Sequence, residues 1–108
     1  MEEANLASAR QFVRYAVGQS WEAAQTGELS LGQRARLRLA ATHAVTTSAR
    51  VVDAMYNLGG GTSIYSKSPL QRRFRDVHAA TQHMMVGQPT YELAGKVLLG
   101  LEVNPAEL

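Results

Sequence analysis

Apolar residues recur every three or four positions near the start of the chain, which is the spacing of a helix buried along one side. Gly27 interrupts this pattern, and glycine commonly follows the last turn of a helix. The pattern therefore predicts a first helix over residues 5 to about 26. Its expected buried stripe is Leu6, Ala9, Val13, Ala16, Val17 and Ala24.

A second helix is predicted from residue 31 to about residue 58, with Ser30 as its N-cap. Its apolar face is rich in alanine and serine, which allow neighbouring helices to approach closely. We therefore expect this helix to be buried on more than one side. The members of the stripe are Leu37, Ala41, Ala44, Val45, Ser48, Val52 and Met55.

Three successive glycines, residues 59–61, end the second helix, because each costs about 1 kcal/mol relative to alanine in a helix interior. Ser68 and Pro69 are typical of a helix start, as N-cap and first helical residue. A third helix is predicted from there until Gly87 and Pro89, and a short fourth one over residues 90 to about 101, followed by a frayed tail. The buried stripe of the third helix is Leu70, Phe74, Val77, Thr81 and Met84.

These elements predict an all-α fold, an antiparallel helical bundle with short connections. Two long helices, one medium and one short one do not close a bundle symmetrically. Apolar surface on the first two helices should therefore remain uncovered, which indicates oligomerisation or a missing preceding element.

Composition and charge exclude several classes of protein. The 108 residues allow one domain at most, and a net charge of +2 is too small for a general nucleic-acid scaffold. We expect no membrane span and no targeting segment. The chain has no cysteine, so disulfides and thiolate metal sites are excluded and a cytoplasmic location is expected.

Basic residues form two clusters, one in the second helix and one at the start of the third. Each cluster either faces an anion or belongs to an ion-paired, solvated helix surface. Arg72 and Asp76 are four residues apart and are expected to pair on one face. The two clusters are Arg34, Arg36 and Arg38, and Arg72, Arg73 and Arg75.

Gly60 and Gly61 leave backbone N–H groups uncovered by side chains. This arrangement suits close approach of a phosphate or a flat ring, although a capped turn explains one glycine equally well. No strand precedes the glycines and no Gly-Lys-Ser/Thr follows, so nucleotide-binding glycine motifs are excluded.

The three histidines offer little for metal binding. On a continuous third helix, His78 and His83 would point about 140° apart, and His43 lies in an alanine-rich stretch where a structural role is expected. His83 would share a helical face with Arg72 and Asp76, beside methionines that favour a packed, hydrogen-bonded imidazole. No serine, histidine and acid triad or carboxylate pair follows from the spacing.

The glycine and arginine segments together resemble the C-terminal helical domain of the acyl-CoA dehydrogenase superfamily. In that family a Gln-x-x-Gly-Gly-x-Gly-Tyr segment precedes Pro-x-x-Arg-x-x-Arg-Asp; here asparagine replaces the glutamine and serine the third glycine. The resemblance covers essentially the whole chain, as a partial domain over residues 1–108 that lacks the first helix. The matching positions are Asn57, Gly60, Gly61, Ser63, Pro69, Arg72, Arg75 and Asp76.

Residues further along resemble a flavin-dependent monooxygenase branch, which includes dibenzothiophene monooxygenase, the oxygenase of 4-hydroxyphenylacetate hydroxylation and indole-acetate monooxygenase. Met84 stands where some dehydrogenases place their carboxylate base, and a thioether is no base. His83 occupies the position of the branch's active-site histidine. An imidazole can steady an oxygen atom of the reaction or take a phenolic proton.

This resemblance implies reduced flavin, FMN or FAD, supplied by a separate flavin reductase. It also implies that Asn57, Gly60 and Gly61 lie near the flavin of a neighbouring subunit in a homodimer or homotetramer. Nucleic acid, membrane and metal partners are not implied.

Three hypotheses remain open at this stage. The first is the C-terminal portion of a two-component monooxygenase for a small aromatic or heterocyclic substrate, inactive as an isolated fragment. The second is an acyl-CoA dehydrogenase domain whose base lies elsewhere in the protein. The third is a non-catalytic oligomerisation module.

Overall fold

A computed structural model describes residues 1–61, 69–83 and 85–108 of the chain. The described residues form helices and no strand, in an elongated molecule measuring 51 × 23 × 22 Å. The elements are α1 (Glu2–Thr26), α2 (Leu31–Gly59), α3 (Pro69–Thr81), α4 (Pro89–Leu98) and a short 3-10 helix, η2 (Pro105–Glu107).

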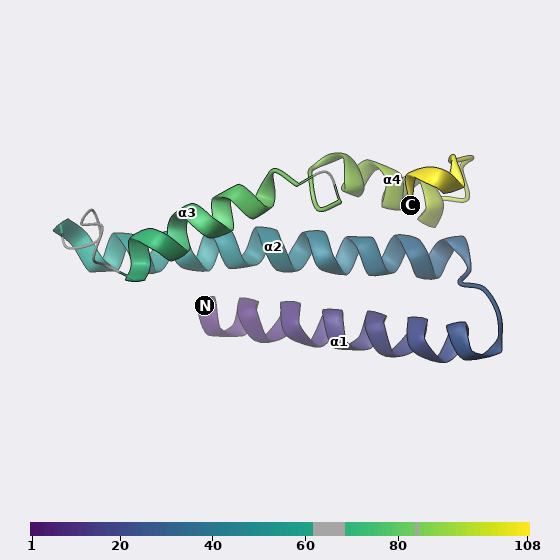
Figure 1. Ribbon diagram of the computed structural model, residues 1–108, viewed down its shortest axis with the longest axis horizontal. Coiled ribbons are helices and arrows are strands. Elements are labelled where there is room, and N and C mark those ends of the chain that lie inside the picture. Colours follow the sequence, from purple (N-terminus) through teal and green to yellow (C-terminus); the bar gives the residue numbers. More distant parts are fainter. Residues whose placement is uncertain (62–68, 84) are drawn as a thin grey trace.

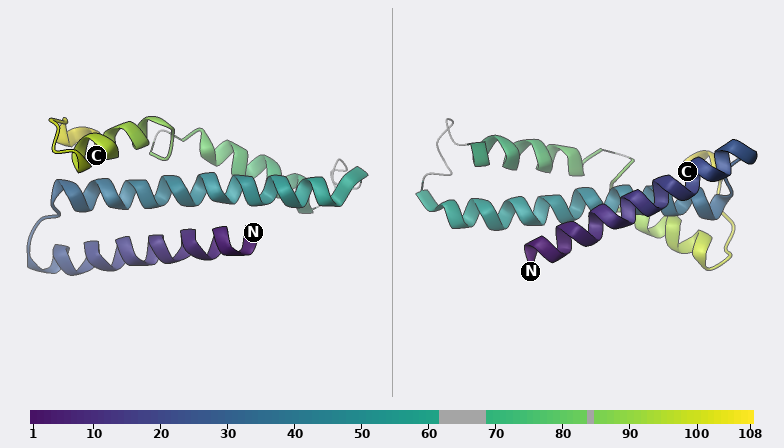
Figure 2. Two further views of the ribbon diagram at one scale, coloured as in Figure 1. Left: turned by 180° about the vertical axis from the view of Figure 1, so that it is seen from behind. Right: turned by 90° about the horizontal axis from the view of Figure 1, so that it is seen from below.

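Helix α2 is the central element of the fold. Helix α1 runs antiparallel along one side of α2, whereas α3 and α4 return one after the other along the opposite side (Figure 1; Figure 2, left). The all-α antiparallel prediction is confirmed. The burial of α2 on more than one side is confirmed as well.

Small side chains make up the fully buried core. Because alanine, serine and threonine project little from a helix, they allow α2 to lie close to its neighbours on both sides. The buried residues are Ala9, Ala16 and Ser20 of α1, Ala35, Ala40, Thr42, Thr47 and Ala49 of α2, and Thr90 and Ala94 of α4.

Both ends of α2 follow the sequence prediction. The Ser30 hydroxyl accepts a hydrogen bond from the Gln33 amide at 3.1 Å, and the Gln33 side chain accepts one from the Ser30 amide at 2.9 Å. This reciprocal capping box satisfies two amides that the first helical turn leaves without partners. At the other end Gly60 adopts a φ of 57°, a conformation that favours glycine. Ser68, the expected cap of the third helix, lies outside the described residues.

The third helix ends earlier than predicted, at Thr81. The amides of Gln82 and His83 bond to carbonyls three residues back, and the Thr81 hydroxyl donates to the His78 carbonyl at 2.6 Å. These local bonds compete with the helical ladder and close it before Gly87 and Pro89 are reached. The prediction that His83 shares a helical face with Arg72 and Asp76 is therefore wrong, since His83 lies in the turn between α3 and α4. The expected stripe residue Met84 lies outside the described residues.

The segment after α4 was predicted to fray and does not. Helix α4 ends at Leu98 rather than near residue 101, and Asn104 then caps η2 by accepting from the Ala106 amide at 3.0 Å. The Arg34 guanidinium donates to the Pro105 carbonyl at 2.7 Å. A long-range bond thus holds this segment against α2.

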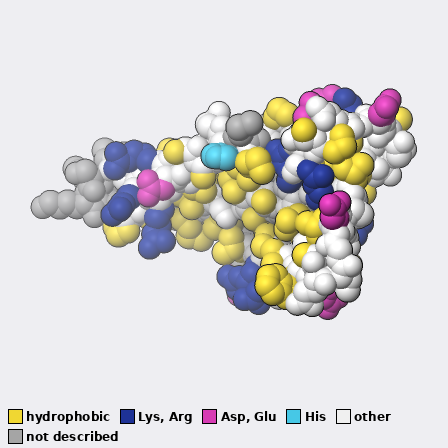
Figure 3. Space-filling model, turned by 45° about the vertical axis from the view of Figure 1, so that its right-hand side comes forward, with side chains coloured by type: hydrophobic (Ala, Val, Ile, Leu, Met, Phe, Trp, Pro, Cys, Tyr) yellow, Lys and Arg dark blue, Asp and Glu magenta, His cyan; other side chains and the backbone are white. Residues whose placement is uncertain are grey.

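Apolar surface remains uncovered on this single chain, as the sequence predicts. Trp21 is 68% exposed and Leu58 is 81% exposed, and Val17, expected in the buried stripe of α1, is 50% exposed. Ala24, expected in the same stripe, is exposed as well. Figure 3 shows hydrophobic side chains spread across the middle of one face, with Lys and Arg on either side. No described helix is long and apolar enough to cross a membrane.

Candidate functional site

His83 lies on the wall of a hollow of about 860 Å³ between α2, the α3–α4 turn and the segment around η2. Three separate parts of the chain therefore line one hollow, which is open to solvent, and His83 is exposed. The lining residues are Arg38, Thr81, Gln82, His83, Met85, Gly87, Gln88, Pro89, Leu93, Ala106, Glu107 and Leu108.

The backbone of the turn fixes the orientation of the His83 ring. The Met85 amide donates to His83 Nδ1 at 3.1 Å, and the Val86 amide donates to the His83 carbonyl at 3.0 Å. A nitrogen that accepts a hydrogen bond carries no proton, so the neutral ring holds its proton on Nε2. His83 is thus set up to donate from Nε2.

Two arginines of the first basic cluster bind backbone carbonyls. Arg38 donates from Nη2 to the Met85 carbonyl at 3.3 Å and to the Thr90 hydroxyl at 3.2 Å, and from Nη1 to the Glu107 carbonyl. Arg34, one helical turn before Arg38 on α2, donates to the Pro105 carbonyl. Both side chains thus bind main-chain oxygen atoms in the segments that follow α3 and α4.

The residues predicted to lie near the flavin, Asn57, Gly60 and Gly61, are at the C-terminal end of α2. Asn57 is exposed there, and a Cβ atom added at Gly60 or Gly61 would meet nothing within 4 Å. The positive φ of Gly60 accounts for one glycine. Gly61 has no positive φ, so neither its backbone conformation nor contact with the described residues requires a glycine there.

The structure does not bring these two parts together within one chain. His83 shares a hollow with Arg38, whereas Asn57 lies nineteen residues further along the same helix. At 1.5 Å per residue Arg38 and Asn57 lie roughly 30 Å apart along α2. The two parts therefore lie at different levels of α2, one beside the connection between α3 and α4 and the other at the C-terminal end of the helix (Figure 1).

The second basic cluster lies on the exposed side of α3. Arg72 and Asp76 form the expected pair at 3.8 Å, with side chains 82% and 72% exposed. Exposed pairs of this kind contribute little to stability. Arg73 and Arg75 are exposed as well.

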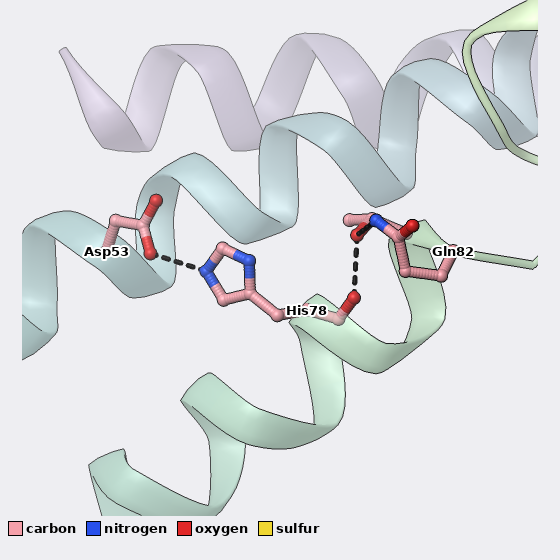
Figure 4. A network of polar contacts seen from close by, with 4 residues as sticks. Asp53, His78 and Gln82 are labelled. Atoms are coloured by element: carbon pink, nitrogen blue, oxygen red, sulfur yellow. Dashed lines mark hydrogen bonds and ion pairs between the residues drawn. The ribbon is translucent and has the colours of Figure 1, made fainter.

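A contact between α2 and α3 was not foreseen from the sequence. His78 donates from Nε2 to Asp53 Oδ1 at 2.7 Å, and its ring lies against Phe74, which in turn lies against Tyr56. Figure 4 shows Asp53 and His78 facing each other, with Gln82 at the end of α3. One signal was available, because Asp53 is the only acidic residue between Glu28 and Asp76.

We expect Asp53→Ala to lower the free energy of unfolding by about 1 kcal/mol more than Asp76→Ala does, because only Asp53 joins two helices. Both changes replace an aspartate by alanine within a helix, so the effect of helix propensity is shared. Urea denaturation of the two variants measures the difference. Equal stabilities would show that the Asp53–His78 bond does not hold α3 in place.

His43 packs against Phe12 across α1 and α2, with ring centroids 6.3 Å apart, which agrees with the structural role expected for it. In the described part of the chain, no three residues among His, Cys, Asp and Glu gather as metal ligands would.

Comparisons with known proteins agree with this architecture. Residues 2–88 match the family model for the acyl-CoA dehydrogenase C-terminal domain. The chain is 36% identical over 107 residues to an indole-3-acetate monooxygenase of Pseudomonas putida, covering 98% of this chain and 28% of that protein. An indole-3-acetate monooxygenase of Acinetobacter baumannii is 38% identical over 81 residues, which is 75% of this chain and 21% of that protein.

A solved structure is similar in fold as well. The HsaA monooxygenase from M. tuberculosis superposes with a TM-score of 0.77 at 25% identity, over 94% of this chain and 28% of that chain. The chain thus spans less than a third of each of these relatives. The family resemblance predicted from the glycine and arginine segments is confirmed: the chain belongs to the acyl-CoA dehydrogenase C-terminal domain family, and these relatives are monooxygenases.

Proposed function

We propose that the chain is the C-terminal portion of a flavin-dependent two-component monooxygenase that hydroxylates a small aromatic or heterocyclic substrate. The observation that carries this proposal is the placement of His83, held as a hydrogen-bond donor on the wall of an 860 Å³ hollow, in a chain whose relatives are monooxygenases. In this account residues 1–108 form a partial domain, and the remaining walls of the site come from elsewhere.

Reduced flavin, either FMN or FAD, would supply the electrons that activate oxygen. His83 would contribute a hydrogen bond from Nε2 to an oxygen atom in the pocket. To act as a base, the neutral ring would need a free lone pair, and Nδ1 already accepts the Met85 amide at 3.1 Å. The geometry therefore favours the donor role over removal of a phenolic proton.

The C-terminal end of α2 would contact the flavin of a second copy. The bare backbone at Gly60 and Gly61 fits the approach of a flat ring, and the exposed Asn57 offers an amide beside it. Arg38, which lines the His83 hollow, lies roughly 30 Å from Asn57 along α2, and the proposal therefore takes the two parts of one flavin site from different copies. The proposal therefore requires a homodimer or homotetramer, and the exposed Leu58 favours such an assembly.

Two measurements test this assignment. Flavin titration of the chain, followed by fluorescence quenching and combined with sedimentation mass, should show a multimer with residual flavin binding but no hydroxylation of an aromatic substrate. The proposal implies a longer monooxygenase that contains this chain, here called the parent enzyme. In the parent enzyme, hydroxylation should require oxygen and a flavin reductase. Flavin reduction by an acyl-CoA without a reductase would instead select the dehydrogenase alternative. A multimer that binds no flavin would favour the oligomerisation module.

A further inference from the structure

We propose that Arg38 is a positioning residue, which holds the α3–α4 turn so that His83 keeps its proton on Nε2. The inference rests on the proposed function only in assigning His83 to a reactive site. The positioning itself is a property of this chain and can be measured without turnover.

Arg38 is connected to His83 through a single residue, Met85. The guanidinium donates to the Met85 carbonyl at 3.3 Å, and the Met85 amide donates to His83 Nδ1 at 3.1 Å. The first bond limits rotation of the Met85 backbone, and the second selects which ring nitrogen carries the proton. Loss of the first bond should therefore weaken the second.

Thr90 anchors the other side of this connection. Its side chain is 1% exposed, and its hydroxyl lies 3.2 Å from Arg38 Nη2 and 3.4 Å from the Met85 carbonyl. Because Thr90 lies in the first turn of α4, the guanidinium ties α2 both to the turn and to the helix that follows it.

Arg38 also holds the opposite wall of the hollow, through its bond to the Glu107 carbonyl. A guanidinium has five N–H groups in a planar fork and can serve all these acceptors at once. A lysine has one compact ammonium on a flexible stem and cannot. The proposal therefore requires arginine here rather than any positive charge.

The test measures the tautomer of His83 by ¹⁵N NMR of the chain at about pH 8.5, where an ordinary imidazole is neutral. The wild type should show an acceptor-type Nδ1 and a protonated Nε2. In Arg38→Lys and Arg38→Met the ¹⁵N chemical shifts of Nδ1 and Nε2 should become more similar, because both tautomers are then populated. Exchange of the Met85 amide should become about tenfold faster, the change expected when one hydrogen bond is lost.

Arg34→Met is the matched control. Arg34 lies one turn from Arg38 on α2 and likewise binds a backbone carbonyl, that of Pro105. The control variant should loosen η2 and leave the His83 tautomer unchanged. Thr90→Val replaces the hydroxyl by a methyl group and so removes one anchor of Arg38. It should change the His83 ¹⁵N chemical shifts in the same direction by a smaller amount, and it is the second variant if Arg38→Met does not fold.

A His83 ring that keeps its proton on Nε2 and a Met85 amide that stays protected in Arg38→Lys and Thr90→Val would overturn the proposal. A mixed tautomer in the Arg34→Met control would overturn it as well, because the effect would then not be specific to Arg38. Failure of the proposed function would appear separately, as normal hydroxylation by a parent enzyme that lacks His83.

Discussion

Replacing His83 by alanine in the parent enzyme is expected to lower substrate hydroxylation about 100-fold, the loss typical of one removed hydrogen-bond donor at a reacting oxygen. The donor is Nε2, because the Met85 amide occupies Nδ1. His83→Gln should therefore recover much of the rate, since its side-chain amide nitrogen reaches the place of Nε2. His83→Asn should recover little, since its shorter side chain ends near the place of Nδ1.

The measurement is the ratio of hydroxylated product to released hydrogen peroxide in each variant, with reductase and oxygen in excess. All three variants should form less product and release more peroxide than the wild type. The alanine variant should be the most affected, the asparagine variant the next and the glutamine variant the least. Normal hydroxylation with normal peroxide release in His83→Ala would show that His83 has no role in the reaction. Equal rates for the glutamine and asparagine variants would show that Nε2 is not the donor.

Enlarging Ala40 to leucine is expected to have the largest effect on stability. Ala40 is 1% exposed in the central helix, where α1 lies on one side and α3 and α4 on the other. Three added carbon atoms have no space in such a core, and overpacking costs about 2 to 3 kcal/mol. For a chain of this size the midpoint of thermal unfolding should fall by more than about 10 °C.

Ala7→Leu is the matched control, because Ala7 is exposed on α1. It should change the unfolding free energy by less than about 0.5 kcal/mol. Circular dichroism at increasing temperature compares the two variants at one concentration, since oligomers unfold in a concentration-dependent way. Similar midpoints for both variants would contradict close packing around α2.

The fold was largely predictable from local signals in the sequence. The three-and-four spacing placed α1 and α2, and Ser30 with Gln33 forms a cap whose chemistry is local. The small residues of α2 indicated burial on two sides, because only such residues allow helices to approach from both. Gly60 ended the helix as expected for a residue with positive φ.

The late part of the chain was less predictable, because its structure depends on contacts that periodicity does not contain. The apolar stripe of α3 continued past Thr81, yet the Thr81 hydroxyl and the His83 ring bind backbone groups and end the helix. The segment around Pro105 looked unstable by itself and is held by Arg34, 71 residues away.

The candidate site shows the same division. The motifs predicted Asn57, Gly60, Gly61 and His83 as site residues, but sequence order alone gave no distance between them. Arg38, which lines the His83 hollow, lies roughly 30 Å from Asn57 along α2. The proposal accordingly takes the two parts of the flavin site from different copies.

Mixed oligomers of the parent enzyme test this central claim most directly. One copy carries His83→Ala and the other Gly61→Leu, a change whose added Cβ atom meets no described atom of the same chain within 4 Å. Each variant alone should be inactive. If each site takes His83 from one copy and the glycines from another, random mixing restores about one quarter of wild-type hydroxylation, because one site in four receives both intact parts. A mixture no more active than the average of the two variants would contradict the shared site.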